Sequence, residues 1–176
     1  MIFTTTRLII RNYRHGDRDI LFAISAMPET RTYHTRVPDQ ADNDAFIDAQ
    51  IATLKSIGCG YAVVERKADG VILGDVGMRP MTGDMPIPPD VRYDIGWMLG
   101  PQYFGQGYAT EAALGWLGHD FRKPQPGEVV SYTAAANLAS IKVMERIGMR
   151  RSAALDFDHP EVAEGHPLRR QVVYSL

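Results

Sequence analysis

The residues whose types and spacing point most directly to chemistry lie within positions 94–113. Two glycines, Gly105 and Gly107, stand between a predicted strand that ends at Leu99 and a predicted helix that begins near Tyr108. Glycine lets backbone N–H groups approach a ligand closely. The first N–H groups of a helix lack intrahelical partners and carry a partial positive charge. This arrangement predicts a binding site for a pyrophosphate group.

The glycine pair alone does not specify the ligand, because a tight turn with a structural helix cap gives the same pattern. No Lys-Ser or Lys-Thr pair follows the glycines, which excludes the phosphate-binding loop of nucleoside triphosphatases. The third glycine and the distant acidic residue of the dinucleotide-binding fingerprint are also absent. A different phosphate-containing ligand and a purely structural turn are the two readings that stay open.

The segments around these residues predict an α+β fold, in which a mixed sheet of about seven strands is covered by about four helices. Strands are expected at 7–13, 61–65, 71–79, 91–99, 129–133, 149–157 and 168–176. Helices are expected at 17–27, 39–57, 108–122 and 137–147, where apolar residues recur at helical spacing. Residues 28–38 and the proline-rich residues 80–90 are expected to be irregular. No boundary divides the chain, so we expect one domain over residues 1–176.

Composition narrows the classes of partner. The 176 residues carry a net charge of −2, so nucleic acid is not an expected partner. No apolar stretch approaches the ~20 residues that cross a bilayer, and the N-terminal residues lack the apolar run of a signal peptide. The single cysteine, Cys59, excludes an intrachain disulfide and a cysteine-based metal cluster. We therefore expect a cytoplasmic protein with no membrane partner and no metal.

The glycine segment resembles the acetyl-CoA-binding motif of the GNAT superfamily of N-acetyltransferases, Arg/Gln-x-x-Gly-x-Gly/Ala. Residues 105–112 read Gly-Gln-Gly-Tyr-Ala-Thr-Glu-Ala, which is similar to the branch that contains ribosomal-protein N-terminal acetyltransferases. Phe104 stands where Arg or Gln is usual, and an aromatic residue there also resembles that branch. Further segments that resemble the family, in the same order along the chain, are 6–11, 94–97 and 137–149.

The resemblance implies a mostly antiparallel sheet and acetyl-CoA as the acetyl donor. It implies that the glycine turn and the following helix hold the pyrophosphate. The backbone at Met98–Leu99 would polarise the acetyl carbonyl and pair with the pantetheine arm, which Asn137 would also contact. The coenzyme-binding residues that it implies are Met98, Leu99, Phe104, Gly105, Gln106, Gly107, Tyr108, Ala109, Thr110, Asn137 and Ser140.

Acetyl transfer to an amine requires a general base, because a free alkylamine has a pKa near ~10. We nominate Asp94 as a catalytic residue, because desolvation in an otherwise apolar strand should raise the pKa of its carboxyl group. The structural alternative is a buried acid bonded to backbone or to a partner such as Arg92 or Arg79. A chain of waters and His34 are the remaining candidates for the base.

The departing thiolate requires an acid or a hydrogen-bond donor. Many GNAT enzymes carry a tyrosine seven residues after the helix asparagine, but Met144 stands there. The resemblance to the ribosomal-protein branch implies that Ser140, three residues after Asn137, takes this catalytic position instead. The alternative for Ser140 is a hydroxyl bonded to local backbone. Asn137 is also expected to cap the helix.

Substrate determinants are expected in residues 28–38 and 80–90, with Tyr33, His34 and Arg79 as candidate contacts. The acceptor is expected to be a primary amine, either a protein or peptide N-terminus or a small molecule such as a polyamine or an aminoglycoside. A CoA-binding module that has lost catalysis is a third hypothesis, because the usual tyrosine is missing. A homodimer stays open.

Overall fold

A nine-stranded sheet forms the centre of the computed structural model, which describes residues 1–81, 83, 85–119 and 128–176. Its order is β1-β2-β3-β4-β5-β6-β9-β7, with β8 also paired to β9. Every pairing is antiparallel except that of β5 with β6, which confirms the predicted mixed and mostly antiparallel sheet. The strands are β1 (Phe3–Thr4), β2 (Leu8–Arg11), β3 (Tyr61–Arg66), β4 (Ile72–Pro80), β5 (Tyr93–Leu99), β6 (Val129–Ala134), β7 (Arg150–Arg151), β8 (Phe157–Asp158) and β9 (Arg170–Ser175).

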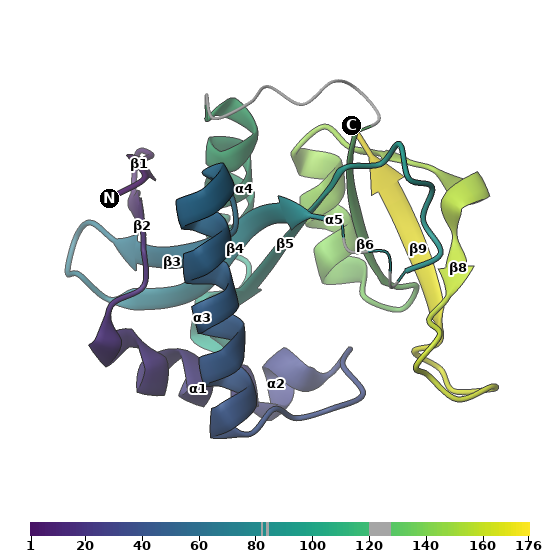
Figure 1. The fold of residues 1–176 in the computed structure, drawn as a ribbon, viewed down its shortest axis with the longest axis horizontal. Helices are drawn as coiled ribbons and strands as arrows, with labels where there is room; N and C mark the ends of the chain where they lie inside the picture. Colours follow the sequence, from purple (N-terminus) through teal and green to yellow (C-terminus); the bar gives the residue numbers. More distant parts are fainter. Residues whose placement is uncertain (82, 84, 120–127) are drawn as a thin grey trace.

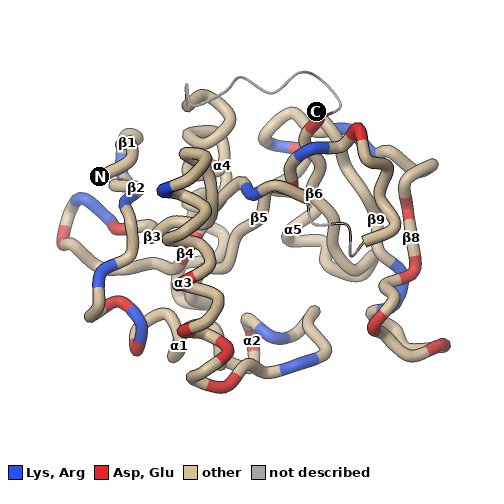
Figure 2. Tube along the Cα trace, in the orientation of Figure 1, with Lys and Arg blue, Asp and Glu red and all other residues tan. Residues whose placement is uncertain are grey.

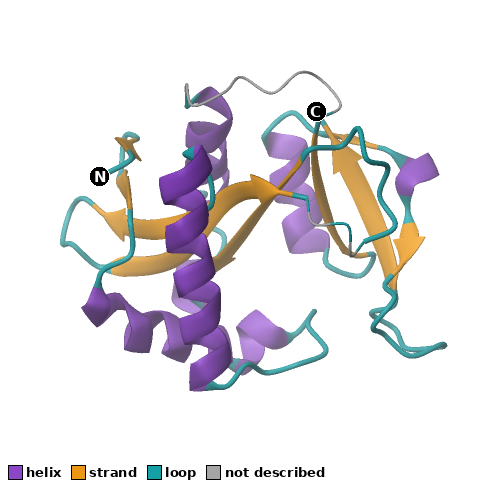
Figure 3. Ribbon diagram, in the orientation of Figure 1, coloured by secondary structure: helices purple, strands orange, loops and turns teal. Residues whose placement is uncertain are grey.

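Helices cover both faces of this sheet (Figures 1 and 3). Ala62 and Val64 of β3 pack in the cluster that contains α4, whereas Val63 between them packs with α1 and α3. Because neighbouring side chains of a strand point to opposite faces, α4 lies on one face of the sheet and α1 with α3 on the other. Within the described residues, no helix is both long and apolar enough to cross a bilayer. The helices are α1 (Arg18–Ala26), α2 (Pro28–Arg31), α3 (Gln40–Ile57), α4 (Tyr108–Gly118) and α5 (Leu138–Arg146).

The caps of α3 explain where this helix begins and ends. The side chain of Asp39 accepts a hydrogen bond of 2.8 Å from the N–H of Asp42, and the side chain of Asp42 accepts one from the N–H of Asp39. These bonds satisfy amides that the first turn would otherwise leave without partners. Gly58 ends the helix with a φ of 80°, a left-handed conformation that favours glycine. Gly58 is therefore the C-terminal cap of α3.

The sheet opens between β5 and β6 (Figure 1). The two strands pair only at Tyr93 with Val129 and at Asp94 with Val130. By contrast, β5 stays in unshifted register with β4 along its whole length. The half of β5 that follows Asp94 therefore presents an edge that β6 does not cover, and α4 begins shortly after this half ends.

Some predicted elements differ from the structure. Residues 28–38 contain the single turn α2, because Pro28 is suited to the first position of a helix. The strand expected at 149–157 is divided into β7 and β8 by a 3-10 turn at Ala153–Leu155. The short strand β1 was not predicted. Phe121 and Arg122, expected at the end of α4, and Asp84, in the expected loop 80–90, lie outside the described residues.

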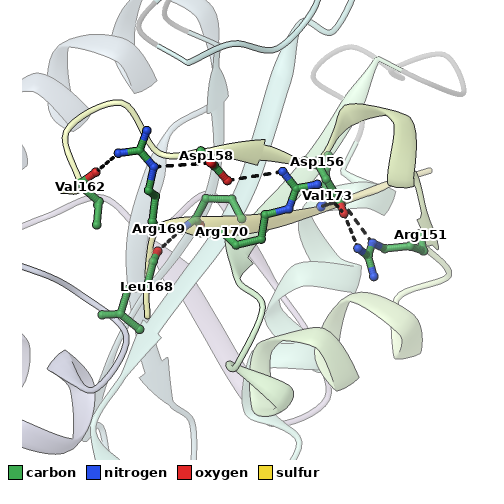
Figure 4. Close-up of polar contacts among 9 residues, drawn as sticks. Arg151, Asp156, Asp158, Val162, Leu168, Arg169, Arg170 and Val173 are labelled. Atoms are coloured by element: carbon green, nitrogen blue, oxygen red, sulfur yellow. Dashed lines mark hydrogen bonds and ion pairs between the residues drawn. The ribbon is translucent and has the colours of Figure 1, made fainter. Parts of the chain in front are cut away.

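A network of arginines and aspartates fixes the C-terminal strands (Figure 4). Asp156 accepts a hydrogen bond of 3.0 Å from the N–H of Val173 and forms an ion pair with Arg151. The Nη1 of Arg169 donates to the carbonyl of Val162 at 2.6 Å, and its Nε lies 3.4 Å from Asp158. These bonds tie the connection between β8 and β9 to the sheet, on the side of β9 away from β5.

Candidate active site

The glycine turn before α4 has the conformation that close approach of a ligand requires. Gly105 and Gly107 have φ values of 72° and 81°, which favour glycine, and open space surrounds the position where a Cβ of Gly105 would stand. The N–H of Glu111 is bonded to Gly107 O at 3.0 Å and closes the first helical turn. The amides of residues 108–110 therefore precede the intrahelical ladder and can serve an anion.

Thr110 adds a second sign that a ligand binds here. Its hydroxyl oxygen is buried and has no hydrogen-bond partner among the described residues. A buried hydroxyl without a partner costs about 1–3 kcal/mol, so such groups usually serve a ligand or a water. Thr110 lines the same cleft as the glycine turn, which fits the predicted site for a pyrophosphate.

A cleft of about 500 Å³ runs from this turn along the uncovered edge of β5 to α5. It brings together nearly all predicted coenzyme-binding residues, and Tyr33 and His34 also line it. Gln106 is the exception, because its side chain turns back to donate to Gln102 O at 2.8 Å. Two cations of α5, Lys142 and Arg146, line the cleft as well.

The register of β5 decides which backbone groups face the opening. Gly100 N–H donates to Leu73 O of β4 at 2.8 Å, and the pairing with β4 is unshifted from there to Tyr93. Because the amides of a strand alternate in direction, those of Met98 face β4, and those of Trp97 and Leu99 face the opening. The predicted backbone role therefore fits Leu99, whereas Met98 contributes its side chain.

Ser140 and Asn137 are joined at the start of α5. Asn137 caps the helix by accepting from Ser140 N–H at 3.2 Å, and its Nδ2 donates to Ser140 Oγ at 3.0 Å. The indole N–H of Trp97 donates to the same Oγ at 3.3 Å from the other side of the opening. Both acceptor positions of the serine hydroxyl are thereby used, so its own proton is left to be donated into the cleft.

A second cavity of about 330 Å³ lies against α1, α3 and the strands β3–β5. It shares three lining residues with the cleft, namely His34, Trp97 and Met98, so the two cavities meet at the end of β5. Arg79, a predicted substrate contact, lines this second cavity. The two cavities could hold two reactants whose reacting atoms approach each other beside Met98.

Asp94, the predicted base, is instead engaged in an ion pair. Its two oxygens accept from the Nε and Nη2 of Arg79 at 2.9 and 3.2 Å, and only 8% of its side chain is exposed. Burial raises the pKa of Asp94, whereas Arg79 opposes this rise. Asp94 lines neither cavity. The geometry therefore supports the structural alternative for Asp94.

Asp75, which the sequence analysis did not single out, lines the second cavity. It lies on β4 directly opposite Met98 of β5, and the hydroxyl of Tyr13 donates to its Oδ2 at 3.2 Å. Burial raises the pKa of Asp75 to about 7, although Tyr13 and Arg31 oppose this rise. A carboxyl group with this pKa is well placed to accept a proton near neutral pH. The position of Asp75 next to Met98 follows from the pairing of β4 with β5, which is not evident from the sequence.

Arg7 is a second functional residue that the sequence analysis missed. Its Nε donates to Glu111 Oε2 at 2.6 Å and its Nη1 donates to Gln106 O at 3.0 Å. Its guanidinium also lies 4.4 Å from the centre of the Tyr108 ring. The segment just before β2 thereby holds the glycine turn and the first turn of α4 in place.

Known proteins share both this fold and this sequence pattern. A family model described as an acetyltransferase (GNAT) domain matches residues 7–150. The uncharacterised protein YkkB of Bacillus subtilis (strain 168) is 29% identical over 152 residues, which cover 86% of each chain. A GNAT-family acetyltransferase from Bacillus anthracis superposes with a TM-score of 0.76 at 23% identity, over 98% of this chain and 96% of that one.

RimL, a ribosomal-protein alpha-N-acetyltransferase solved in complex with coenzyme A, has the same fold. Its TM-score is 0.74 at 16% identity, over 99% of this chain and 96% of RimL. The family match includes the glycine turn, β5 and α5, which together form the cleft. GNAT enzymes take an acetyl group from acetyl-CoA and pass it to an amine. This chain belongs to the GNAT family of N-acetyltransferases.

Proposed function

We propose that this chain transfers the acetyl group of acetyl-CoA to a primary amine, with the donor in the cleft and the acceptor in the second cavity. The observation that carries the proposal is the junction of the two cavities at Trp97 and Met98. A thioester in the cleft and an amine in the second cavity would meet there, which is the positioning that a two-substrate transfer needs.

The residues of the cleft offer partners for the phosphates and the pantetheine arm of coenzyme A. The amides of residues 108–110 and the hydroxyl of Thr110 supply donors for the pyrophosphate. Lys142 and Arg146 add positive charge on the α5 side of the same cleft. The backbone of Trp97 and Leu99 would pair with the amides of the pantetheine arm as an added strand would.

Asp75 would prepare the amine. An alkylamine arrives as an ammonium ion, and Asp75 would accept one of its protons and free the lone pair for attack. Bound acetyl-CoA supplies a thioester, whose acyl carbon bonds to the nitrogen while its C–S bond breaks. Leu99 N–H would donate to the acyl oxygen as negative charge develops there.

Ser140 would complete the proton transfers. Its free hydroxyl proton would pass to the departing sulfur, and the second proton lost by the nitrogen would restore the serine through water. The products are then an N-acetyl amine and the free thiol, with one proton held on Asp75.

The test is release of the coenzyme A thiol with a panel of primary amines and N-terminal peptides. Asp75→Asn should slow turnover by about 10²- to 10⁴-fold, and Ser140→Ala by about 10-fold or more, because each removes a proton-transfer group. Asp19→Asn, an isosteric change at an exposed position of α1, should leave turnover unchanged.

Binding of coenzyme A without thiol release on any amine would contradict the proposal and identify a CoA-binding module. Equal rates for Asp75→Asn and the native chain would show that Asp75 is not the base, while the proposed acetyl transfer itself would stand. A preference for peptides over small amines would identify a polypeptide N-terminus as the acceptor.

A further inference from the structure

Arg31 projects a positive charge into the second cavity. It is the last residue of α2, and its Nε donates to the carbonyl of Ser25 at the end of α1. Its Nη2 lies 3.5 Å from the sulfur of Met98, the residue at which the cavity meets the cleft. The guanidinium is therefore fixed at both ends of its planar group, beside the expected position of the reacting amine.

The other arginines near this cavity are neutralised by carboxylates, but Arg31 is not. Arg79 is paired with Asp94, and Arg36 lies 2.5 Å from Asp42 at the start of α3. Figure 2 shows these basic positions in and after α2 facing the acidic start of α3. Within the described part of the chain, Arg31 forms no ion pair. Burial lowers the pKa of Arg31, and the charge of Asp75, which lines the same cavity, opposes this fall.

The rest of the cavity defines the shape of a small acceptor. Its charged and titratable lining groups are Arg31, His34, Asp42, Tyr61, Asp75 and Arg79. Asp42 and Arg79 are already paired, which leaves Asp75 to face an ammonium group and Arg31 to face an anion. Apolar side chains from α1 and α3 complete the wall, namely Leu21, Ile24 and Phe46.

We infer that the acceptor is a small amino carboxylate with an apolar side chain, whose carboxylate is bound by Arg31 while its amine faces Asp75. This inference rests on the proposed function and names its substrate class. The planar guanidinium offers paired N–H donors to a carboxylate, and such charge-assisted bonds are among the strongest in proteins. A polyamine or an aminoglycoside would bring a second ammonium group against Arg31, which disfavours those acceptors.

The test compares matched acceptors that differ only in the carboxylate. The kcat/KM values for leucine, leucinamide and 3-methylbutylamine are measured by thiol release at saturating acetyl-CoA. The native chain should prefer leucine over the two analogues that lack the carboxylate by about 10- to 100-fold, as expected for a charge-assisted bond. Arg31→Gln should remove this preference through a higher KM for leucine, and Arg31→Lys should restore part of it.

Arg14→Gln is the matched control, because it removes an arginine charge that is 70% exposed and lines neither cavity. A purely structural role for Arg31 would reduce kcat/KM for all three acceptors equally and would overturn the inference. Acetylation of spermidine or leucinamide in preference to leucine would overturn it too, while the proposed acetyltransferase stands. Absence of thiol release with every acceptor, peptides included, would overturn both.

Discussion

Two aspartates on neighbouring strands differ in what surrounds their carboxylates. Both oxygens of Asp94 accept from Arg79, whereas Asp75 faces a cavity and, among the residues that the structure describes, accepts a side-chain hydrogen bond only from the phenol of Tyr13. An arginine partner stabilises a charged carboxylate, and burial without such a partner favours the neutral acid. The environment therefore ties the carboxylate of Asp94 to Arg79, whereas Asp75 is a group that can exchange a proton near pH 7.

Asp75 should set the pH dependence of the reaction. The carboxylate must be ionised to accept a proton, so kcat/KM should rise with pH with a midpoint of about 7. Asp75→Asn should abolish this rising limb, whereas Asp94→Asn should retain it and lower stability by leaving Arg79 without its partner. The measurement is thiol release across the pH range on both sides of that midpoint.

His34 is the other titratable group that faces both cavities. Burial, followed by the charge of Arg31, lowers the pKa of His34 below its usual value of 6.5, so the histidine should already be neutral where the limb appears. His34→Asn should therefore keep the limb. If the rise of kcat/KM with pH disappeared in His34→Asn and persisted in Asp75→Asn, this would contradict the assignment of Asp75 as the base.

At the scale of elements, the glycine turn depends on a segment far away in the chain. Arg7, which precedes β2, bonds Glu111 and the carbonyl of Gln106 and covers the ring of Tyr108. Its backbone N–H also donates to Glu111 at 2.7 Å. The first turn of α4 is thereby held with its amides facing the cleft before any ligand arrives.

Loss of the Arg7 contacts should weaken the binding of acetyl-CoA more than the binding of the amine. Arg7→Gln should raise the KM for acetyl-CoA by about 10-fold, because the turn would have to be ordered when the coenzyme binds. The KM for the amine should change little, and Arg7→Lys should recover only part of the effect, because lysine cannot make the same pair of bonds. Equal changes in both KM values would argue for a general loss of folding instead.

The sequence predicts well those elements whose signals are local. Apolar residues at helical spacing locate α1, α3 and α5. The glycine turn and Ser140 were also predicted from local motifs. Arg7, Asp75 and Arg31 were not, because their roles arise from contacts between segments distant in the chain, such as the pairing of β4 with β5.

At the scale of the whole molecule, coenzyme binding should be coupled to stability. The hydroxyl of Thr110 is buried and finds no partner in the described part of the chain, so the protein without its ligand carries an unsatisfied group that the coenzyme would satisfy. A ligand that binds only the folded chain stabilises it by about 2.7 kcal/mol at a concentration of 100 Kd. Coenzyme A should therefore raise the melting temperature.

Thr110→Val separates binding from folding. The valine has the same shape and removes an unpaired hydroxyl, so the free energy of unfolding without ligand should stay the same or rise by about 1 kcal/mol. Affinity for coenzyme A should fall about 10-fold, which would cut the stabilisation at the same concentration to about 1.4 kcal/mol. Thermal melts with and without coenzyme A measure both. Unchanged affinity would show that Thr110 does not contact the ligand.

The opening between β5 and β6 has an evolutionary consequence. There, main-chain amides of Trp97 and Leu99 face the proposed donor site, and every amino acid except proline carries such an N–H group. Side chains of α1, α2 and α3 form the wall on the acceptor's side. Substitutions among those side chains can therefore change which amine is accepted, while the backbone groups that recognise the coenzyme stay the same.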